Sequence, residues 1–190
     1  MSILIGLLVV VALTIFVPVF LVISTQNRLV ALDQRCDTAY ADIDVHLKHR
    51  QNLIPSLVET VRGFANHESS VFLGITQARA EALSAATPAK RMKAEKELTQ
   101  NITALIALAE RYPELRASSH FTELRRELVD AENRITASRR FYNLAVGEYD
   151  ATLRQFPGNI VARSRGLNVR MPFDLGIERV LIDEPIAIKF

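Results

Sequence analysis

Apolar residues in this chain form one unbroken run, followed by long stretches in which they recur every three or four positions. The run extends from Ile3 to Ile23 and contains no charged residue. At roughly 1.5 Å per residue, a helix of this length spans the ~30 Å hydrocarbon core of a bilayer. The pattern therefore predicts a transmembrane anchor at residues 1–25, a helical bundle at 26–157 and a basic, apolar tail at 158–190.

A cleaved signal peptide and a buried core helix are the two other interpretations of this run. A signal peptide needs basic residues before its apolar region and a small-residue cleavage site after it. No Lys or Arg precedes the run, and the segment VISTQNR is a poor cleavage context. Because Arg28 and Arg35 follow the run, the positive-inside rule predicts an N-terminus outside and a cytoplasmic domain.

Two apolar stripes of similar length predict two long helices, at about residues 26–64 and 121–156. The first contains one clearly polar member, Arg50. Its members are Leu29, Leu32, Cys36, Ala39, Ile43, Leu47, Arg50, Ile54, Leu57, Val61 and Phe64. Those of the second are Phe121, Leu124, Leu128, Ala131, Ile135, Ser138, Tyr142, Ala145, Tyr149, Thr152 and Phe156.

Two shorter helices are predicted between the long ones. One covers about residues 68–85, and the other begins after Thr87, which is a suitable N-cap, and stops at Pro113. Short connections favour antiparallel neighbours. The predicted fold class is therefore all-α, with an N-terminal transmembrane helix followed by an antiparallel long-helix (four-helix) bundle. A single long coiled coil is the alternative.

Aligning the two long stripes head to tail places position i opposite about 185 minus i and predicts several ion pairs. Arg50 interrupts an apolar stripe, so an unpaired charge there would be costly, and it should pair with Glu132. The other predicted contacts join Asp42 and Asp44 to Arg139 and Arg140, Glu59 to Arg125 and Arg126, and Leu29 to Phe156.

Pro55 falls inside the first long stripe. It removes the helical hydrogen bond to the Gln51 carbonyl, which costs about 3 kcal/mol in an isolated helix. Because the stripe continues in phase beyond it, Pro55 should kink the helix without ending it.

Composition limits the possible functions. The chain has 190 residues, a formal net charge of +2 and one cysteine, Cys36. These values argue against a nucleic-acid partner, an intramolecular disulfide and a multi-cysteine metal site. The sequence has no phosphate-binding glycine loop and no serine-nucleophile motif, so we expect no enzyme, no catalytic residue and no cofactor.

A metal-dependent enzyme built on His46, His49 and His67 is the alternative from another functional class. His46 and His49 can share a helix face, but a di-metal bundle site would need Glu-x-x-His motifs, and the sequence has none. No metal site is predicted.

The tail combines arginines with apolar residues and has no acid between Asp150 and Asp174. Helix four returns along helix one, so the tail should reach the membrane surface and meet anionic headgroups. A solvated arginine-rich loop is the alternative. The predicted membrane-contact residues are Arg154, Arg163, Arg165 and Arg170. The final segment VLIDEPIAIKF alternates apolar and polar residues, which suggests an extended conformation.

The segments DIDVHLKHRQNLIPSLVETVRGFANHE and YPELRASSHFTELRRELVDAENRITASRRFYNLAVGEYDATLRQFPGNIVA, with the anchor, resemble the LemA family of bacterial membrane proteins. The resemblance covers about residues 3–166 and is weak beyond. It implies a single-pass anchor in the bacterial inner membrane, a cytoplasmic bundle and a poorly defined role as a scaffold or envelope-stress factor. One branch occurs with magnetosome membranes. The shared polar positions, with no assigned roles, are His49, Arg50, Pro55, Glu59, His67, Glu132, Asn133 and Arg134.

Together these features favour a membrane-anchored, non-enzymatic scaffold that self-associates or displays its bundle to other membrane proteins. Small residues on the stripes, Ala39, Ala131 and Ala145, would let helices approach closely. A lipid or stress-signal sensor acting through the arginine-rich tail is the alternative function.

Overall fold

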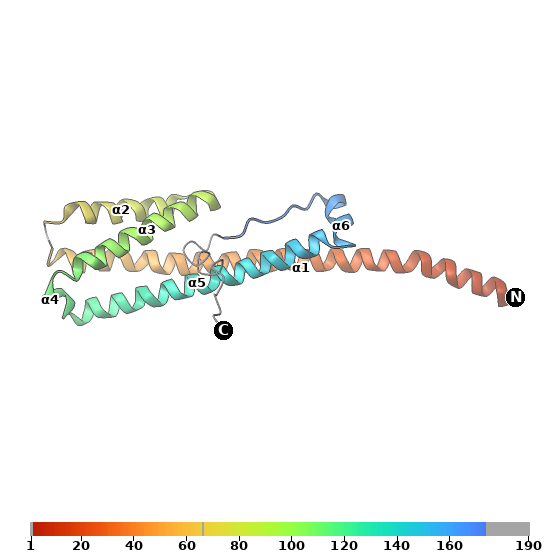
Figure 1. The fold of residues 1–190 in the computed structure, drawn as a ribbon, viewed down its shortest axis with the longest axis horizontal. Coiled ribbons are helices and arrows are strands. Elements are labelled where there is room, and N and C mark those ends of the chain that lie inside the picture. The colour runs from red at the N-terminus through yellow and green to blue at the C-terminus, as the bar shows by residue number, and fades with distance from the viewer. Residues whose placement is uncertain (1, 66, 174–190) are drawn as a thin grey trace, which may run out of the picture. The chain divides into compact units, whose positions relative to one another are not determined.

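The computed structural model of the chain describes residues 2–65 and 67–173, whose regular structure is entirely helical (Figure 1). The helices are α1 (Ser2–Arg62), α2 (Ser69–Ser84), α3 (Pro88–Ala109), α4 (Pro113–Arg116), α5 (Ser119–Arg154) and α6 (Gly158–Arg165). The predicted all-α class with a long apolar N-terminal helix is confirmed. The segment VLIDEPIAIKF lies outside the described residues.

The described residues divide into two compact units, and α1 and α5 contribute to both. The first, which we call the anchor unit, contains residues 2–41 and 139–173. The second, the bundle unit, contains residues 42–65 and 67–138. The sequence-based boundaries at residues 25 and 157 separate a membrane anchor, a helical bundle and a tail, and this division remains a prediction.

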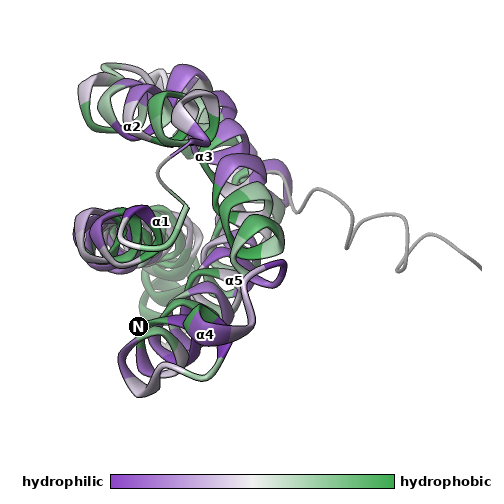
Figure 2. Cartoon of the chain, turned by 90° about the vertical axis from the view of Figure 1, so that its left-hand side faces the viewer, coloured by the Kyte–Doolittle hydropathy of each residue, from purple (hydrophilic) through white to green (hydrophobic). Residues whose placement is uncertain are grey.

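The bundle unit is held by a continuous apolar core. Ile54, Leu57 and Val61 of α1 meet residues of α2, α3, α4 and α5 in one buried cluster. In Figure 2, α2 and α3 carry apolar and polar residues on different sides, as amphipathic helices do. The other members are Ala65, Phe72, Ile75, Ala78, Ala82, Ala94, Leu98, Ile102, Leu105, Leu108, Ala109, Leu115, Phe121, Leu124 and Leu128.

The predicted stripes are buried except at their ends. Residues at the stripe positions of α1 between Leu29 and Val61 are buried, apart from the half-buried Leu32. Phe64 and Phe156 are instead 43% and 76% exposed. Both lie beyond a helix end, because α1 stops at Arg62 and α5 stops at Arg154, so the helical period no longer directs them inward. The predicted contact between Leu29 and Phe156 is therefore wrong.

Within each unit, α1 and α5 pair antiparallel. In the anchor unit Arg35 binds Glu148 at 2.6 Å, and the Tyr40 and Tyr142 rings lie 5.6 Å apart. In the bundle unit Arg50 binds Glu132 of α5. Each partner falls within one helical turn of the predicted position.

The helix ends follow local signals, with three differences from the prediction. Thr87 caps α3 as expected, its hydroxyl accepting the Lys90 N–H at 3.3 Å. The anchor and the first long helix form one helix, since no Gly or Pro separates Ile23 from Leu29. The short helices α4 and α6 were not predicted. Gly166 ends α6 in the left-handed conformation (φ 64°), which glycine adopts without strain.

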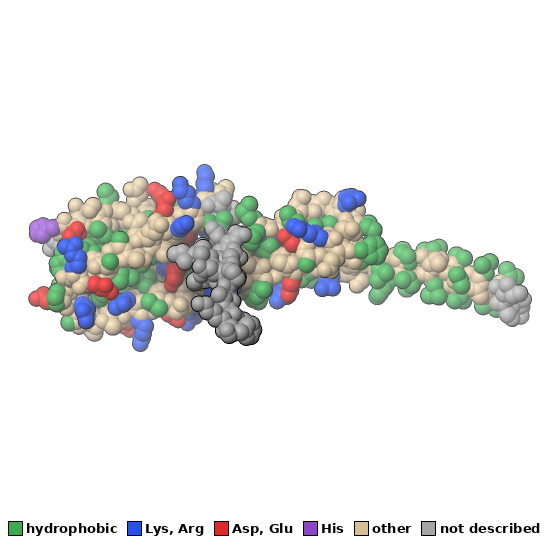
Figure 3. All heavy atoms as spheres, in the orientation of Figure 1, with side chains coloured by type: hydrophobic (Ala, Val, Ile, Leu, Met, Phe, Trp, Pro, Cys, Tyr) green, Lys and Arg blue, Asp and Glu red, His purple; other side chains and the backbone are tan. Residues whose placement is uncertain are grey.

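The N-terminal part of α1 exposes apolar side chains in every direction. Figure 3 shows hydrophobic atoms covering this part of the helix, with no charged side chain on the visible face. The segment is long and apolar enough to cross a membrane, and none of its most apolar window is buried within the chain. A buried core helix is therefore excluded among the described residues.

Candidate functional site

Arg50 is the largest fully buried side chain of the described residues and lies at the centre of a polar network in the bundle unit. Its Nη1 donates to Glu132 Oε2 of α5 at 2.5 Å and to Thr99 Oγ1 of α3 at 2.8 Å. Its Nη2 donates to Glu95 Oε2 of α3 at 2.5 Å. The structure thus brings the predicted pair Arg50 and Glu132 together, and it adds a second carboxylate.

Glu95 is the partner that the sequence reasoning missed. Its side chain has no solvent exposure, and its second oxygen, Oε1, accepts Gln51 Nε2 at 2.5 Å. A signal was present in the sequence: Glu95 precedes Leu98, Ile102, Leu105 and Ala109 in steps of three and four. It is therefore an acid at an apolar stripe position, the counterpart of Arg50 on the other helix.

Pro55 creates a docking point for α2. Helix α1 continues through Pro55 to Arg62, but proline has no N–H to give the Gln51 carbonyl. Arg79 of α2 donates its Nε to that carbonyl at 2.8 Å. A hydrogen bond missing within one helix thus becomes a hydrogen bond between two helices.

The network therefore joins four helices: Arg50 and Gln51 of α1, Arg79 of α2, Glu95 and Thr99 of α3, and Glu132 of α5. Buried charges of opposite sign are tolerated because each is bonded to the other. Glu95 is fully buried and Glu132 is 39% exposed, so water reaches only one side of the network. This arrangement braces helices and leaves no carboxylate oxygen of Glu95 free for chemistry.

The other predicted pairs have different outcomes. Among the described residues no ion pair joins Glu59 to Arg125 or Arg126, and Arg125 lies 3.8 Å from Glu110 instead. This predicted pairing is wrong.

The aspartates at the other end of the predicted register also differ. Asp44 binds Arg91 of α3 at 2.6 Å rather than Arg140. Asp42 and Arg139 belong to different units, and their pairing stays a prediction.

The three histidines do not form a common site. His46 and His49 lie on α1, with His46 half-buried and His49 exposed. His67 follows α1, whose end at Arg62 lies about 20 Å from His49 along the helix axis at 1.5 Å per residue. Within the described part of the chain, no three His, Cys, Asp or Glu side chains are arranged to hold a metal ion.

In the anchor unit, the extended residues 167–173 return along α1 and α5; we call this segment the strap. Arg170 ion-pairs with Asp33 and Asp37 of α1, at 2.7 Å each. Its backbone N–H donates to Asp150 Oδ1 of α5 at 3.1 Å. Arg170 is thus engaged within the protein, so the membrane-contact prediction is retained only for the other three arginines.

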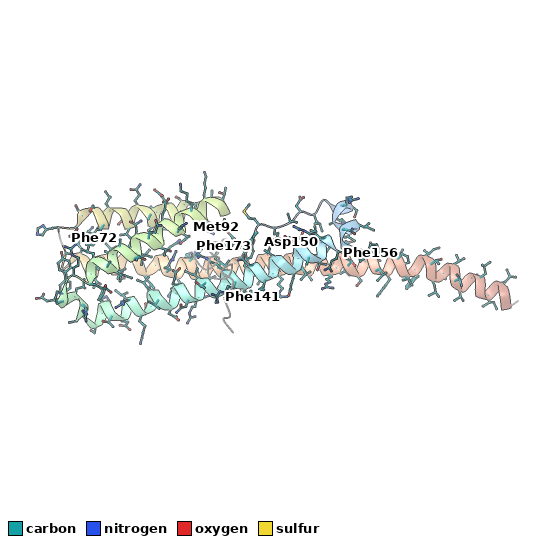
Figure 4. The ribbon with its side chains drawn as sticks, in the orientation of Figure 1. Phe72, Met92, Phe141, Asp150, Phe156 and Phe173 are labelled. Atoms are coloured by element: carbon teal, nitrogen blue, oxygen red, sulfur yellow. The ribbon has the colours of Figure 1, made fainter. Side chains whose placement is uncertain are left out.

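The end of the strap is fixed by α5. The Asn143 amide brackets Phe173, accepting its N–H at 2.7 Å and donating to its carbonyl at 2.8 Å. Tyr142 donates its hydroxyl to the Met171 carbonyl at 3.1 Å, and Arg139 covers the Phe173 ring at 4.8 Å. Figure 4 labels Phe173, the last residue of the strap, and Asp150 of α5, which accepts the Arg170 N–H.

The strap lies close to Cys36, which is fully buried. Burial raises the pKa of the Cys36 thiol, an effect that Arg170 opposes and that Asp33 and Asp37 reinforce. Partial burial lowers the pKa of Arg170, but hydrogen bonds from its guanidinium to Asp37 and Asp33 outweigh this and raise it above its usual value. Cys36 is thus a protonated, packed thiol rather than a nucleophile.

Comparisons with known proteins identify one family and several relatives. The model of the LemA family matches residues 39–190. "Protein LemA" of Metamycoplasma hominis is 29% identical over 174 residues, covering 90% of this chain and 79% of that protein. "Magnetosome protein MamQ 2" of Paramagnetospirillum magneticum is 21% identical over 183 residues, covering 83% of this chain and 67% of that protein. "Magnetosome protein MamQ" of Magnetospirillum gryphiswaldense is 20% identical over 166 residues, covering 74% and 61%.

Removing Arg50 should destabilise the protein far more than removing Arg50 and Glu95 together. Arg50→Leu leaves the Glu95 charge buried and unpaired, and we expect a loss of about 3–5 kcal/mol in the free energy of unfolding. The double variant Arg50→Leu with Glu95→Leu should recover most of this loss. Denaturant unfolding followed by circular dichroism checks the difference, and equal losses in both variants would contradict the buried pairing.

The Arg79 bond should matter only while Pro55 is present. Arg79→Ala leaves the Gln51 carbonyl without a partner and should cost about 1–3 kcal/mol of unfolding free energy. In a Pro55→Ala background the alanine N–H can reach that carbonyl, so the same change should cost much less. A double-mutant cycle measures the coupling, and identical costs in both backgrounds would refute this role for Pro55.

Opening the strap should expose Cys36. The positive charge of Arg170 lowers the pKa of Cys36, so Arg170→Ala should raise that pKa and leave less of the reactive thiolate. Faster reaction with a maleimide in this variant would therefore come from better access to the thiol. We expect faster labelling in Arg170→Ala and an unchanged rate in the matched surface variant Arg163→Ala. Slow labelling in both would show that the strap does not protect the thiol.

Proposed function

The chain belongs to the LemA family, and from this premise we propose that it is a membrane-anchored, non-enzymatic helical scaffold that self-associates. Its partners are the lipid bilayer, further copies of the chain and other membrane proteins. We place it in the bacterial inner membrane, with the N-terminus outside and the helical units in the cytoplasm. Arg28 and Arg35 after the apolar segment support this orientation.

The observation that carries the proposal is the continuity of α1. One helix runs from the exposed apolar segment into fully packed residues of the anchor unit, such as Cys36 and Ala39. A helix without a break holds its membrane and packed segments on one axis, whereas a flexible linker would leave them independent. This continuity suits a protein that presents a rigid surface from the membrane.

The polar groups in the described core support a structural role. Arg50, Gln51 and Glu95, its buried polar residues, bind one another or neighbouring helices. An active site would instead direct a reactive group into a cleft open to substrate. The network supports the proposal that this protein positions partners without transforming them.

Self-association needs a surface other than the predicted stripes. Ala39, Ala131 and Ala145 are each at most 1% exposed, so the single chain already uses them for its own packing. Phe141 and Leu144, three residues apart on α5, remain 45% and 68% exposed. Such a pair on one helix face is a suitable contact for a second copy.

The mass of the full-length chain in detergent tests this proposal. At micromolar concentration, light scattering should give a mass above that of one chain, and Leu144→Glu should shift it towards the monomer. Val45→Glu, at a residue 64% exposed elsewhere on α1, is the matched control and should leave the mass unchanged. A wild-type monomer would refute self-association while leaving the membrane anchor in place.

A further inference from the structure

Helix α6 has one buried side and one exposed side of mixed character. Gly158, Val161 and Ala162 are buried against the rest of the anchor unit. Ile160 is 55% exposed, and Phe156, four residues before it, is 76% exposed. Arg163 and Arg165 are exposed in the last turn. The outer surface therefore combines two large apolar side chains with two cations.

This surface lies where α1 leaves the packed part of the anchor unit. The pairing of Arg35 with Glu148 places Arg154, at the end of α5, level with about residue 29 of α1. From Leu4 to Ile23 the large apolar side chains of α1 are all exposed, whereas Leu29 is 1% exposed. In Figures 1 and 4, which share one orientation, α6 and Phe156 lie at the same level along the long axis as this part of α1.

The charge at this end of the unit is positive. Arg28, Arg154, Arg163 and Arg165 are all exposed. The sequence has no acid between Asp150 and Asp174, and the nearby Asp33 and Asp37 are bound by Arg170. Among the described residues, Arg154, Arg163 and Arg165 form no ion pair with a carboxylate.

We propose that Phe156 and α6 form an interfacial site for anionic phospholipids of the membrane that holds α1. Phe156 and Ile160 enter the boundary between headgroups and acyl chains, and Arg154, Arg163 and Arg165 bind the phosphates. The inference rests on the proposed membrane anchoring of α1. The proposed lipid contact is a folded surface whose apolar side chains insert into the membrane. Arg170 is not part of this surface, because it binds Asp33 and Asp37.

Apolar exposure favours a lipid surface over a solvated loop. A loop that only meets water has no need to expose Phe156, just before α6, together with Ile160 of its first turn. The buried side of α6 shows that the helix is docked, so its outward side chains are held at the transition rather than moving freely. Near the end of the apolar segment of α1, the arginines match the anionic headgroup layer and the exposed apolar side chains match the acyl chains beneath it.

The absence of tryptophan from the chain provides a direct test. We would place the variant Phe156→Trp in nanodiscs, as the full chain, and measure emission and quenching by brominated lipids. We expect a blue-shifted, quenched tryptophan, with stronger quenching in discs containing phosphatidylglycerol than in phosphatidylcholine alone. Raising the salt concentration should reduce the difference between the two lipids.

Two further tryptophan positions separate this inference from the anchoring itself. Phe16→Trp, inside the apolar segment, should be quenched in every disc. Val45→Trp lies about 30 Å beyond Ile23 along α1 and should stay unquenched. If Phe16→Trp is quenched but Phe156→Trp is as unquenched as Val45→Trp, the interfacial site is refuted and the anchor is not. An unquenched Phe16→Trp would refute the anchor.

Charge reversal tests the arginines. One arginine near an anionic surface strengthens association about fivefold, so Arg163→Glu with Arg165→Glu should abolish the phosphatidylglycerol preference of the Phe156→Trp signal. Circular dichroism checks that helix content is retained, and Phe16→Trp should be unaffected. A preserved preference would overturn the arginine assignment. A shift of Phe156→Trp emission caused by inorganic phosphate in phosphatidylcholine discs would indicate a free-anion site and also overturn the proposal.

Discussion

The bundle unit depends on two opposite charges that water does not reach. Arg50 and Glu95 are 1% and 0% exposed, and each is tolerable only because the other is bonded to it. Apolar stripes alone allow helices to slide by a heptad with little loss of burial. A shift of one turn, 5.4 Å, would instead break several bonds of this network at once. The network therefore specifies which helical register the apolar core adopts.

Pro55 belongs to the same constraint. In isolation it weakens α1, since it removes one helical hydrogen bond. In the folded chain, the carbonyl that it frees is the acceptor that α2 binds through Arg79. A residue that is unfavourable for local structure thus contributes to specific tertiary structure, and the energetic cost within one helix is offset by the contact between two.

The sequence predicted well what depends on local periodicity. The apolar stripes, the Thr87 cap and the antiparallel pairing of α1 with α5 follow from spacing of three and four residues, and the pairing led directly to Arg50 and Glu132. Glu95, Arg79 and the Asp44 to Arg91 pair depend on how α2 and α3 pack on α1, which spacing does not determine. The strap was missed because its position depends on tertiary contacts with Asp33, Asp37 and Asn143, which spacing along the chain does not determine. The Glu59 pairing failed since exposed charges gain too little to fix a partner.

The strap also sets where the rest of the chain begins. Phe173 is held by Asn143, eleven residues before the end of α5, so it lies roughly 16 Å from that end along the helix axis. If α6 marks the bilayer surface, whatever follows Phe173 starts at a fixed height above the lipid instead of beside it.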